Sequence, residues 1–217
     1  MIMVIDFLEA SDLQRARETW WAVSGVLSRC AGFQDGQLLE TFDTVQPRVG
    51  YPLASATRWD SAADWDQARA AARSDPKVLA ILGASGTRFT SLKADLVDGR
   101  AFTFRGESPH MVLFDIVYLA PGQAEDYAAM WHEANAYMGA RPGFVNASLH
   151  RSRAADDAIA FVNIAEWETT DLFFDAVHTA RFAEIVESFK EDFSLLLTRR
   201  VLHRGPNATS LLTGDAA

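Results

Sequence analysis

Residues 131–144, WHEANAYMGARPGF, decide the fold, because residues 20–33, WWAVSGVLSRCAGF, carry the same signals 111 positions earlier. Each stretch begins with tryptophan and ends with Gly-Phe. A second pair of tryptophans, Trp59 and Trp167, lies 108 positions apart. A unit of about 110 residues is too long for a solenoid repeat but long enough for a small α+β domain. The chain is therefore predicted to be two fused copies of one domain.

Each copy is predicted to have the element order βαββαβ, which is the ferredoxin-like pattern. Alternating apolar residues indicate strands, and apolar residues at helical spacing indicate helices. A capping box at Ser11 and Gln14 predicts the start of the first helix, and Ser61 caps the second. In the first copy we expect strands at 1–8, 33–43, 50–59 and 88–97. In the second copy we expect strands at 111–119, 144–152, 158–167 and 193–203.

The domain boundaries follow from these elements. Residues 1–104 are predicted to form the first repeat, residues 105–204 the second, and residues 205–217 a flexible tail. Loops are expected at Pro47 and at the turn Pro121-Gly122. A ferredoxin-like sheet has helices on one face only, so two copies can bury their bare faces against each other.

Composition excludes several classes of function. The net charge of −9 disfavours nucleic-acid binding, which needs clustered lysine and arginine. No run approaches the roughly 18 apolar residues of a membrane span. The single cysteine, Cys30, cannot form an internal disulfide, and the N-terminus lacks the features of a signal peptide. A cytoplasmic location is the expectation.

The strand around Asn163 is the best candidate for a site. Alternation along a strand places Ile159, Phe161, Asn163, Ala165 and Trp167 on one face, so an amide would lie among apolar and aromatic groups. Such a surface suits a planar ketone, because an amide N–H stabilises a developing oxyanion. A hydrogen-bonded core asparagine is the alternative.

The first copy lacks this amide. Ser55 and Trp59 correspond to Asn163 and Trp167, and Ser24 corresponds to Asn135 on the helix. The second copy is therefore predicted to be the better-equipped half, and the first is either structural or holds a differently shaped pocket.

Two titratable residues are candidates for proton transfer. Asp115, like Asp6 in the first copy, lies in the middle of an apolar strand, where a carboxylate must find partners or become protonated. His132 follows Trp131 and could reach the pocket rim as a general base. No combination of histidine, cysteine and carboxylates has the spacing of a metal site, so no metal is expected.

The segments WHEANAYMGARPGF and AFVNIAEWETTDLF (residues 160–173) resemble the antibiotic biosynthesis monooxygenase family. The resemblance covers nearly the whole chain as two copies and implies a dimeric α+β barrel fused into one polypeptide. It also implies an oxygenase that uses O₂ to oxidise a fused-ring aromatic polyketide, without a metal or tightly bound cofactor.

The resemblance gives roles to individual residues. The family places an Asn and a Trp in the active cavity as N-x-x-x-W, and Asn163 and Trp167 match that pattern. With His132 and Asp115 they form the predicted catalytic set. The residues predicted to bind substrate are Trp131, Asn135, Phe144, Phe161 and Ile159.

Several alternatives remain open at the level of sequence. Reduced flavin, FADH₂ or FMNH₂, is possible as a cosubstrate, and the absence of a matching family arginine, with Arg181 the nearest, mildly favours it. A non-catalytic small-molecule-binding protein and a non-redox polyketide cyclase are the other two functions considered. The fused chain could also form a homodimer.

Overall fold

The two copies of the sequence form two similar halves of one closed barrel. The computed structural model describes residues 1–45, 50–120, 122–154 and 158–206. The first copy comprises β1 (Ile2–Glu9), α1 (Leu13–Leu27), β2 (Phe33–Val45), β3 (Leu53–Trp59), α2 (Ala62–Ser74), α3 (Pro76–Ser85) and β4 (Arg88–Gly99). The second comprises β5 (Met111–Val117), α4 (Ala124–Met138), β6 (Phe144–Ser152), β7 (Phe161–Trp167), α5 (Thr170–Val177), α6 (Ala180–Val186), a 3₁₀ turn (Glu187–Phe189) and β8 (Phe193–Arg204).

The strands join at the edges of the two copies. Within each copy they follow the ferredoxin-like order, β4-β1-β3-β2 in the first and β8-β5-β7-β6 in the second. Edge strand β2 pairs with β8, and β4 pairs with β6, both antiparallel. These two seams close the barrel, so no sheet edge is left open among these strands. The predicted fold class, two ferredoxin-like repeats in an intramolecular α+β barrel, is confirmed.

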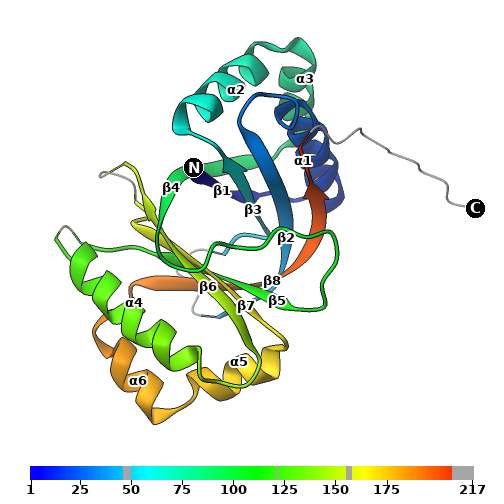
Figure 1. The fold of residues 1–217 in the computed structure, drawn as a ribbon. Coiled ribbons are helices and arrows are strands. Elements are labelled where there is room, and N and C mark those ends of the chain that lie inside the picture. The colour runs from blue at the N-terminus through cyan, green and yellow to red at the C-terminus, as the bar shows by residue number, and fades with distance from the viewer. Residues whose placement is uncertain (46–49, 121, 155–157, 207–217) are drawn as a thin grey trace, which may run out of the picture.

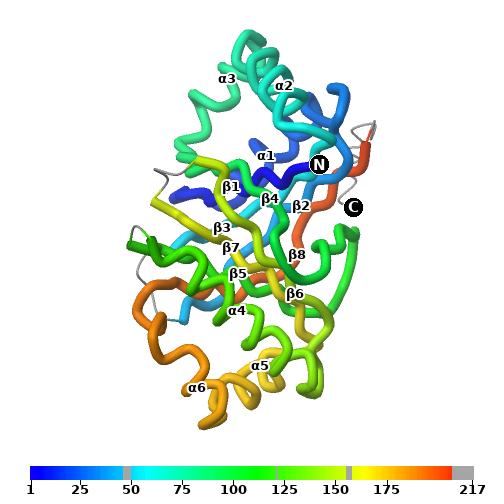
Figure 2. Tube along the Cα trace, turned by 60° about the vertical axis from the view of Figure 1, so that its left-hand side comes forward, coloured from blue at the N-terminus to red at the C-terminus, as the bar shows by residue number. Residues whose placement is uncertain are grey.

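Helices cover the outside of the barrel on two opposite sides. Figure 1 shows α1, α2 and α3 on one side and α4, α5 and α6 on the other, with the strands between them. The turned view in Figure 2 shows the same separation. The barrel interior is filled by apolar side chains from both copies, among them Phe7, Leu39, Phe114 and Ile164. Each sheet therefore buries one face in the barrel and the other under its own helices.

Helix capping agrees with the prediction at one helix and differs at another. Ser61 caps α2, and its side chain accepts a hydrogen bond from the backbone N–H of Asp64 at 3.1 Å. The first helix is capped by Asp12 instead of the predicted Ser11, because the Asp12 carboxylate accepts from the N–H of Arg15 at 3.0 Å. Aspartate caps a helix as well as serine does, so a shift of one residue costs little.

The connector between the copies is short and partly buried. It joins β4 to β5, and the predicted boundary between residues 104 and 105 falls within it. Phe102 from this connector packs into the barrel interior. The expected loop at Pro47, the turn residue Pro121 and the tail from residue 207 lie outside the described residues. None of the helices in the described segments is long and apolar enough to cross a membrane.

Candidate functional site

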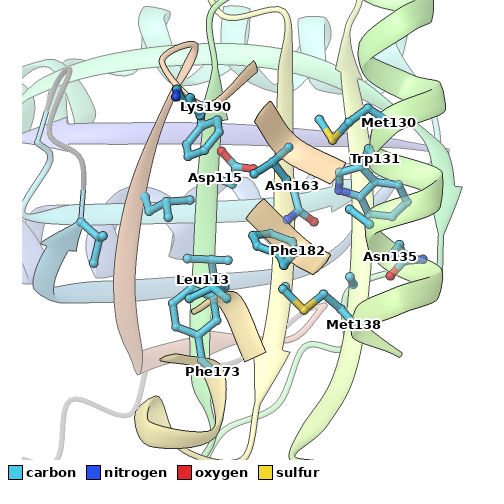
Figure 3. Close-up of a pocket in the computed structure, with 18 of the residues that line it drawn as sticks. Leu113, Asp115, Met130, Trp131, Asn135, Met138, Asn163, Phe173, Phe182 and Lys190 are labelled. Carbon is cyan, nitrogen blue, oxygen red and sulfur yellow. The ribbon is translucent and has the colours of Figure 1, made fainter. Parts of the chain in front are cut away.

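A cavity of about 370 Å³ lies between the sheet of the second copy and helices α4, α5 and α6. Small-molecule sites typically occupy roughly 300–1,000 Å³ and are mostly apolar. Figure 3 shows Trp131 and Asn135 on α4 facing Asp115 and Asn163 on the strands. The wall is formed mainly by apolar side chains, including Leu113, Met130, Trp131, Ala134, Met138, Phe144, Ala147, Ala165, Trp167, Phe173, Val177 and Phe182. Val45 of the first copy completes it.

Two polar side chains on adjacent strands converge in this apolar cavity. Asp115 on β5 lies directly opposite Asn163 on β7, and both line the cavity with 9% of their surface exposed. Tyr127 on α4 donates a long hydrogen bond of 3.4 Å to Oδ2 of Asp115. Within the described residues, neither Oδ1 of Asp115 nor Oδ1 of Asn163 has a hydrogen-bond partner. The pair is therefore available to a ligand.

Burial changes the acidity of Asp115. Removal from water disfavours the charged form and raises the pKa of this carboxyl group to about 7, although the hydrogen bond from Tyr127 acts in the opposite direction. The same burial and the neighbouring carboxylate raise the pKa of Tyr127 well above its usual value. Asp115 can therefore exchange a proton near neutral pH while Tyr127 stays protonated.

In the first copy, both oxygens of the equivalent carboxyl group, on Asp6, accept hydrogen bonds. Asp6 lies opposite Ser55 on β3 and Ser91 on β4. Ser55 Oγ donates to Asp6 Oδ2 at 3.2 Å, and Ser91 Oγ donates to Oδ1. In the second copy the opposing residues are Asn163 and Leu195. Leu195 cannot donate, so the second copy loses the hydrogen bond that Ser91 supplies in the first.

The two equivalent tryptophans differ in the same way. In the first copy, Trp59 Nε1 donates to Thr57 Oγ1 at 3.0 Å. The position equivalent to Thr57 is Ala165, which has no side-chain oxygen. Trp167 is instead held by edge-on ring contacts with Phe144 and Phe173, at centroid separations of 5.4 and 5.7 Å. The substitution removes from Trp167 the partner that Trp59 has.

Most of the predicted site residues meet at the cavity, and three do not. Asn163, Trp167, Asp115, Trp131, Asn135 and Phe144 all line the cavity. His132 lies on the outer side of α4, where Nδ1 is 2.7 Å from Asp98 Oδ2 and the side chain is 74% exposed. A helix turns its neighbouring residues by about 100°, so the residue after Trp131 points away from the cavity.

The two residues predicted to share a strand face with Asn163, Ile159 and Phe161, do not line the cavity. Ile159 packs in the barrel interior, on the side opposite to Asn163, and the prediction that it shares the face is wrong. It precedes β7, which begins at Phe161, so strand alternation does not extend to it. Phe161 is on the expected side of the sheet but is covered by Tyr127, with ring centroids 5.3 Å apart. It supports Tyr127 and does not line the cavity.

The remaining residues named from the sequence do not contribute to the second-copy cavity. Ser55 and Trp59 are fully buried in the first copy, and neither is among the residues that line the first-copy cavity. Arg181 lies outside the second-copy cavity and pairs with Glu133 and Glu184. Among the described residues, no three histidine, cysteine or carboxylate side chains gather as a metal site requires.

The sequence did not single out many of the wall residues, among them Tyr127, His178, Phe182 and Lys190. Tyr127 carried the helical spacing of a core residue, and nothing in its sequence context distinguished a hydrogen-bonded tyrosine from a packed one. His178 stacks on Phe174 with ring centroids 5.5 Å apart. Lys190 forms an ion pair with Glu187 at 2.9 Å.

Comparison with protein families agrees with this geometry. Residues 109–188 match the model of the family described as antibiotic biosynthesis monooxygenase. The second copy is therefore similar to an antibiotic biosynthesis monooxygenase domain. The matched residues run from just before β5 into the 3₁₀ turn and include most of the second-copy cavity wall, while β8 and Val45 lie outside them. None of the curated protein sequences matches the chain significantly.

Solved structures show the same two-copy fold. An anthrone oxidase-like protein is 10% identical, with 97% of each chain covered and a TM-score of 0.74. A protein from Fusobacterium nucleatum, provisionally named a monooxygenase, is 8% identical, with 94% of this chain and 93% of that chain covered and a TM-score of 0.63. A major regulator of staphylococcal pathogenesis is 7% identical, with 90% of this chain and 97% of that chain covered and a TM-score of 0.52. At these identities the likeness is one of fold.

Proposed function

We propose that the second copy is an oxygenase that uses O₂ to oxidise a fused-ring aromatic ketone or phenol of the polyketide type. The family match supports an oxygenase role in general. The observation that carries the proposal is the pair Asp115 and Asn163, which lies in an apolar cavity without a full set of partners. An apolar cavity lined by aromatic rings suits a flat substrate, and the two polar groups can orient its carbonyl.

Asp115 is proposed to be the general base. A base is most effective when its pKa is near the working pH, and burial brings the pKa of Asp115 to about 7. The carboxylate would remove a proton from the carbon that is to be oxidised. The negative charge then moves onto the substrate oxygen.

Asn163 is proposed to stabilise that oxygen by donating a hydrogen bond from its amide. Asp115 and Asn163 are directly opposed on neighbouring strands, so one substrate ring can contact both. A donor that is already fixed in place lowers the barrier because it does not have to reorganise during the reaction. Trp167 is proposed to position the ring through its indole, and Trp131 and Asn135 to bind it from α4.

The reaction balances without an external reductant. Proton loss gives a carbanion, which transfers an electron to O₂, and recombination forms a carbon–oxygen bond and a peroxide anion. The peroxide takes back the proton held by Asp115. The O–O bond then breaks as the second hydrogen leaves the same carbon, which gives a ketone and water. One oxygen atom of O₂ enters the quinone and the other leaves as water.

Reduced flavin as a cosubstrate is less well supported by the cavity. A flavin phosphate needs cationic or backbone N–H partners. Along the described wall, the one lysine or arginine is Lys190, and Glu187 already pairs with it. The residues thus do not form a flavin-phosphate site, and the cofactor-free route is the one proposed.

The test measures oxygen uptake with an anthrone in the wild-type protein and in Asp115→Asn and Asn163→Ala. Asp6→Asn is the matched control, because Asp6 occupies the same strand position in the other copy. We expect uptake without flavin, losses of roughly 10²–10⁴-fold in Asp115→Asn and roughly 10²–10³-fold in Asn163→Ala, and wild-type turnover in Asp6→Asn.

The other outcomes identify the alternatives. Turnover that needs an enzymatic supply of FADH₂ or FMNH₂ would replace the cofactor-free route by the flavin route. Product formed under strict anaerobiosis would indicate a cyclase. Binding of the anthrone without product under any condition would indicate a non-catalytic binding protein, since one fold can serve unrelated functions.

A further inference from the structure

The first copy contains a cavity of its own, about 430 Å³ in volume, between its sheet and its helices. It lies at the place that corresponds to the second-copy cavity. Trp20 occupies the position of Trp131, Leu27 that of Met138, and Trp65 that of Phe173. The two cavities therefore descend from the same site of the repeated domain, and their differences show what each can bind.

The first-copy cavity is polar where the second-copy cavity is apolar. Thr57 replaces Ala165, Ser91 replaces Leu195, and Arg69 replaces Val177 at equivalent positions, and all six residues line their respective cavities. Asp6 is already bonded by Ser55 and Ser91, so it has less capacity than Asp115 to act on a ligand. The first-copy cavity is therefore suited to binding a charged molecule and lacks the free base of the other.

Two arginines lie side by side on the wall of this cavity. Arg69 and Arg73 are four residues apart on α2, and both line the cavity with exposed side chains. Like charges at this spacing destabilise a helix. Asp6, on the same cavity wall, interacts electrostatically with Arg69, but among the described residues no carboxylate lies within ion-pair distance of either guanidinium. An anion that bridges the two would remove this repulsion.

The other residues of the cavity wall indicate what the uncharged part of the anionic ligand is. Aromatic and aliphatic surface on the same wall comes from Trp20, Trp65, Val78, Leu82 and Phe89. Arginine binds a carboxylate through two parallel N–H···O bonds, which a compact ammonium cannot do. A ligand with a flat apolar body and one carboxylate matches both parts of the wall.

We propose that the first copy binds an aromatic carboxylate, with its anion paired to Arg69 and Arg73 and its ring against the apolar wall. This site is separate from the oxygenase site and does not depend on the function proposed for it. It also gives the first copy a role of its own beyond completing the barrel.

The test is calorimetric titration of the full chain with 2-naphthoate and with its neutral counterpart 2-naphthamide. We expect the wild-type protein to bind 2-naphthoate more tightly than 2-naphthamide. The double variant Arg69→Ala with Arg73→Ala should weaken 2-naphthoate binding roughly tenfold or more while leaving 2-naphthamide unchanged, because charge-assisted hydrogen bonds are lost.

Two further variants separate specific pairing from general charge. Lys77→Ala with Arg88→Ala removes the same charge from the first copy outside the cavity and should leave 2-naphthoate binding unchanged. Arg69→Lys with Arg73→Lys keeps the charge but not the paired geometry and should give an intermediate affinity. Circular dichroism melting confirms that each variant is folded.

Three results with the wild-type protein or the Arg69→Ala, Arg73→Ala variant would overturn the proposal. They are equal affinity of the wild-type protein for the two compounds, no binding of 2-naphthoate at millimolar concentration, and unchanged affinity in the Arg69→Ala, Arg73→Ala variant. A loss of affinity as large in the Lys77→Ala, Arg88→Ala control would also overturn it, because the effect would then be one of net charge.

Discussion

Asp115 is the residue whose surroundings most directly set the pH dependence of the proposed reaction. The base must be ionised to accept a proton, and burial raises its pKa to about 7. With an anthrone that does not titrate between pH 5 and 9, kcat/KM should rise through about pH 7 and then level. In Asp115→Asn the residual rate should lack this limb. If kcat/KM of the Asp115→Asn variant still rose near pH 7, the titrating group would be a residue other than Asp115.

The same carboxyl group makes stability depend on pH. In the unfolded chain it loses its proton near its ordinary pKa of 3.8, whereas in the folded chain it keeps the proton until about pH 7. The folded state therefore binds more protons between these values, and stability falls as pH rises. Asp115→Asn stays neutral, so its stability relative to wild type should increase by roughly 1.4 kcal/mol per pH unit in this window. Urea unfolding at several pH values measures the free energy of unfolding of both proteins. A difference between them that does not change with pH would contradict the prediction.

Among the elements, the turn between α4 and β6 depends on Gly143. This residue has a φ of +79°, and a Cβ placed there would lie 2.5 Å from Leu172 on α5. A side chain would cost left-handed strain of about 1–2 kcal/mol and overpacking of roughly 1–3 kcal/mol. Gly143→Ala should therefore lower the melting temperature clearly more than Gly122→Ala.

Gly122 is the control because it has a φ of +90°, but a Cβ added to it would have no other atom within 4 Å. Its substitution carries the strain without the contact. Equal melting temperatures for the two variants would show that α5 moves away from the turn freely.

At the scale of the whole molecule, each copy depends on the other for closure. Without its partner, a copy would expose the edges of β2 and β4, or of β6 and β8, and the barrel face of its sheet. The second-copy cavity would also lose Val45 from its wall. Exposed edges and apolar sheet faces promote aggregation.

Residues 1–104 and 105–217 produced as separate chains should therefore fail to give stable monomers, and together they should form a one-to-one complex with the barrel restored. Size-exclusion chromatography with light scattering distinguishes these states. Cooperative melting of either half as an isolated monomer would contradict the prediction. The possible homodimer of the full chain is tested by the same measurement.

The sequence by itself determined the repeat and the βαββαβ order, because these follow from residue spacing, and the resemblance to a known family implied the barrel. It also identified Asn163, Trp167 and Asp115 as candidates, since a polar residue within an apolar strand is visible in the sequence. Their neighbours were not visible. Whether Asp115 faces serine, asparagine or leucine depends on strand register, and register is fixed only when distant strands pair.

Tertiary structure alone therefore decided that Asp6 is satisfied and that Asp115 is not. It also turned His132 outward, placed Ile159 inside the barrel and set Arg69 and Arg73 on the wall of a second cavity. The physical reason is the same in each case. The chemistry of a buried polar group depends on the partners it finds, and those partners come from segments that only folding brings together.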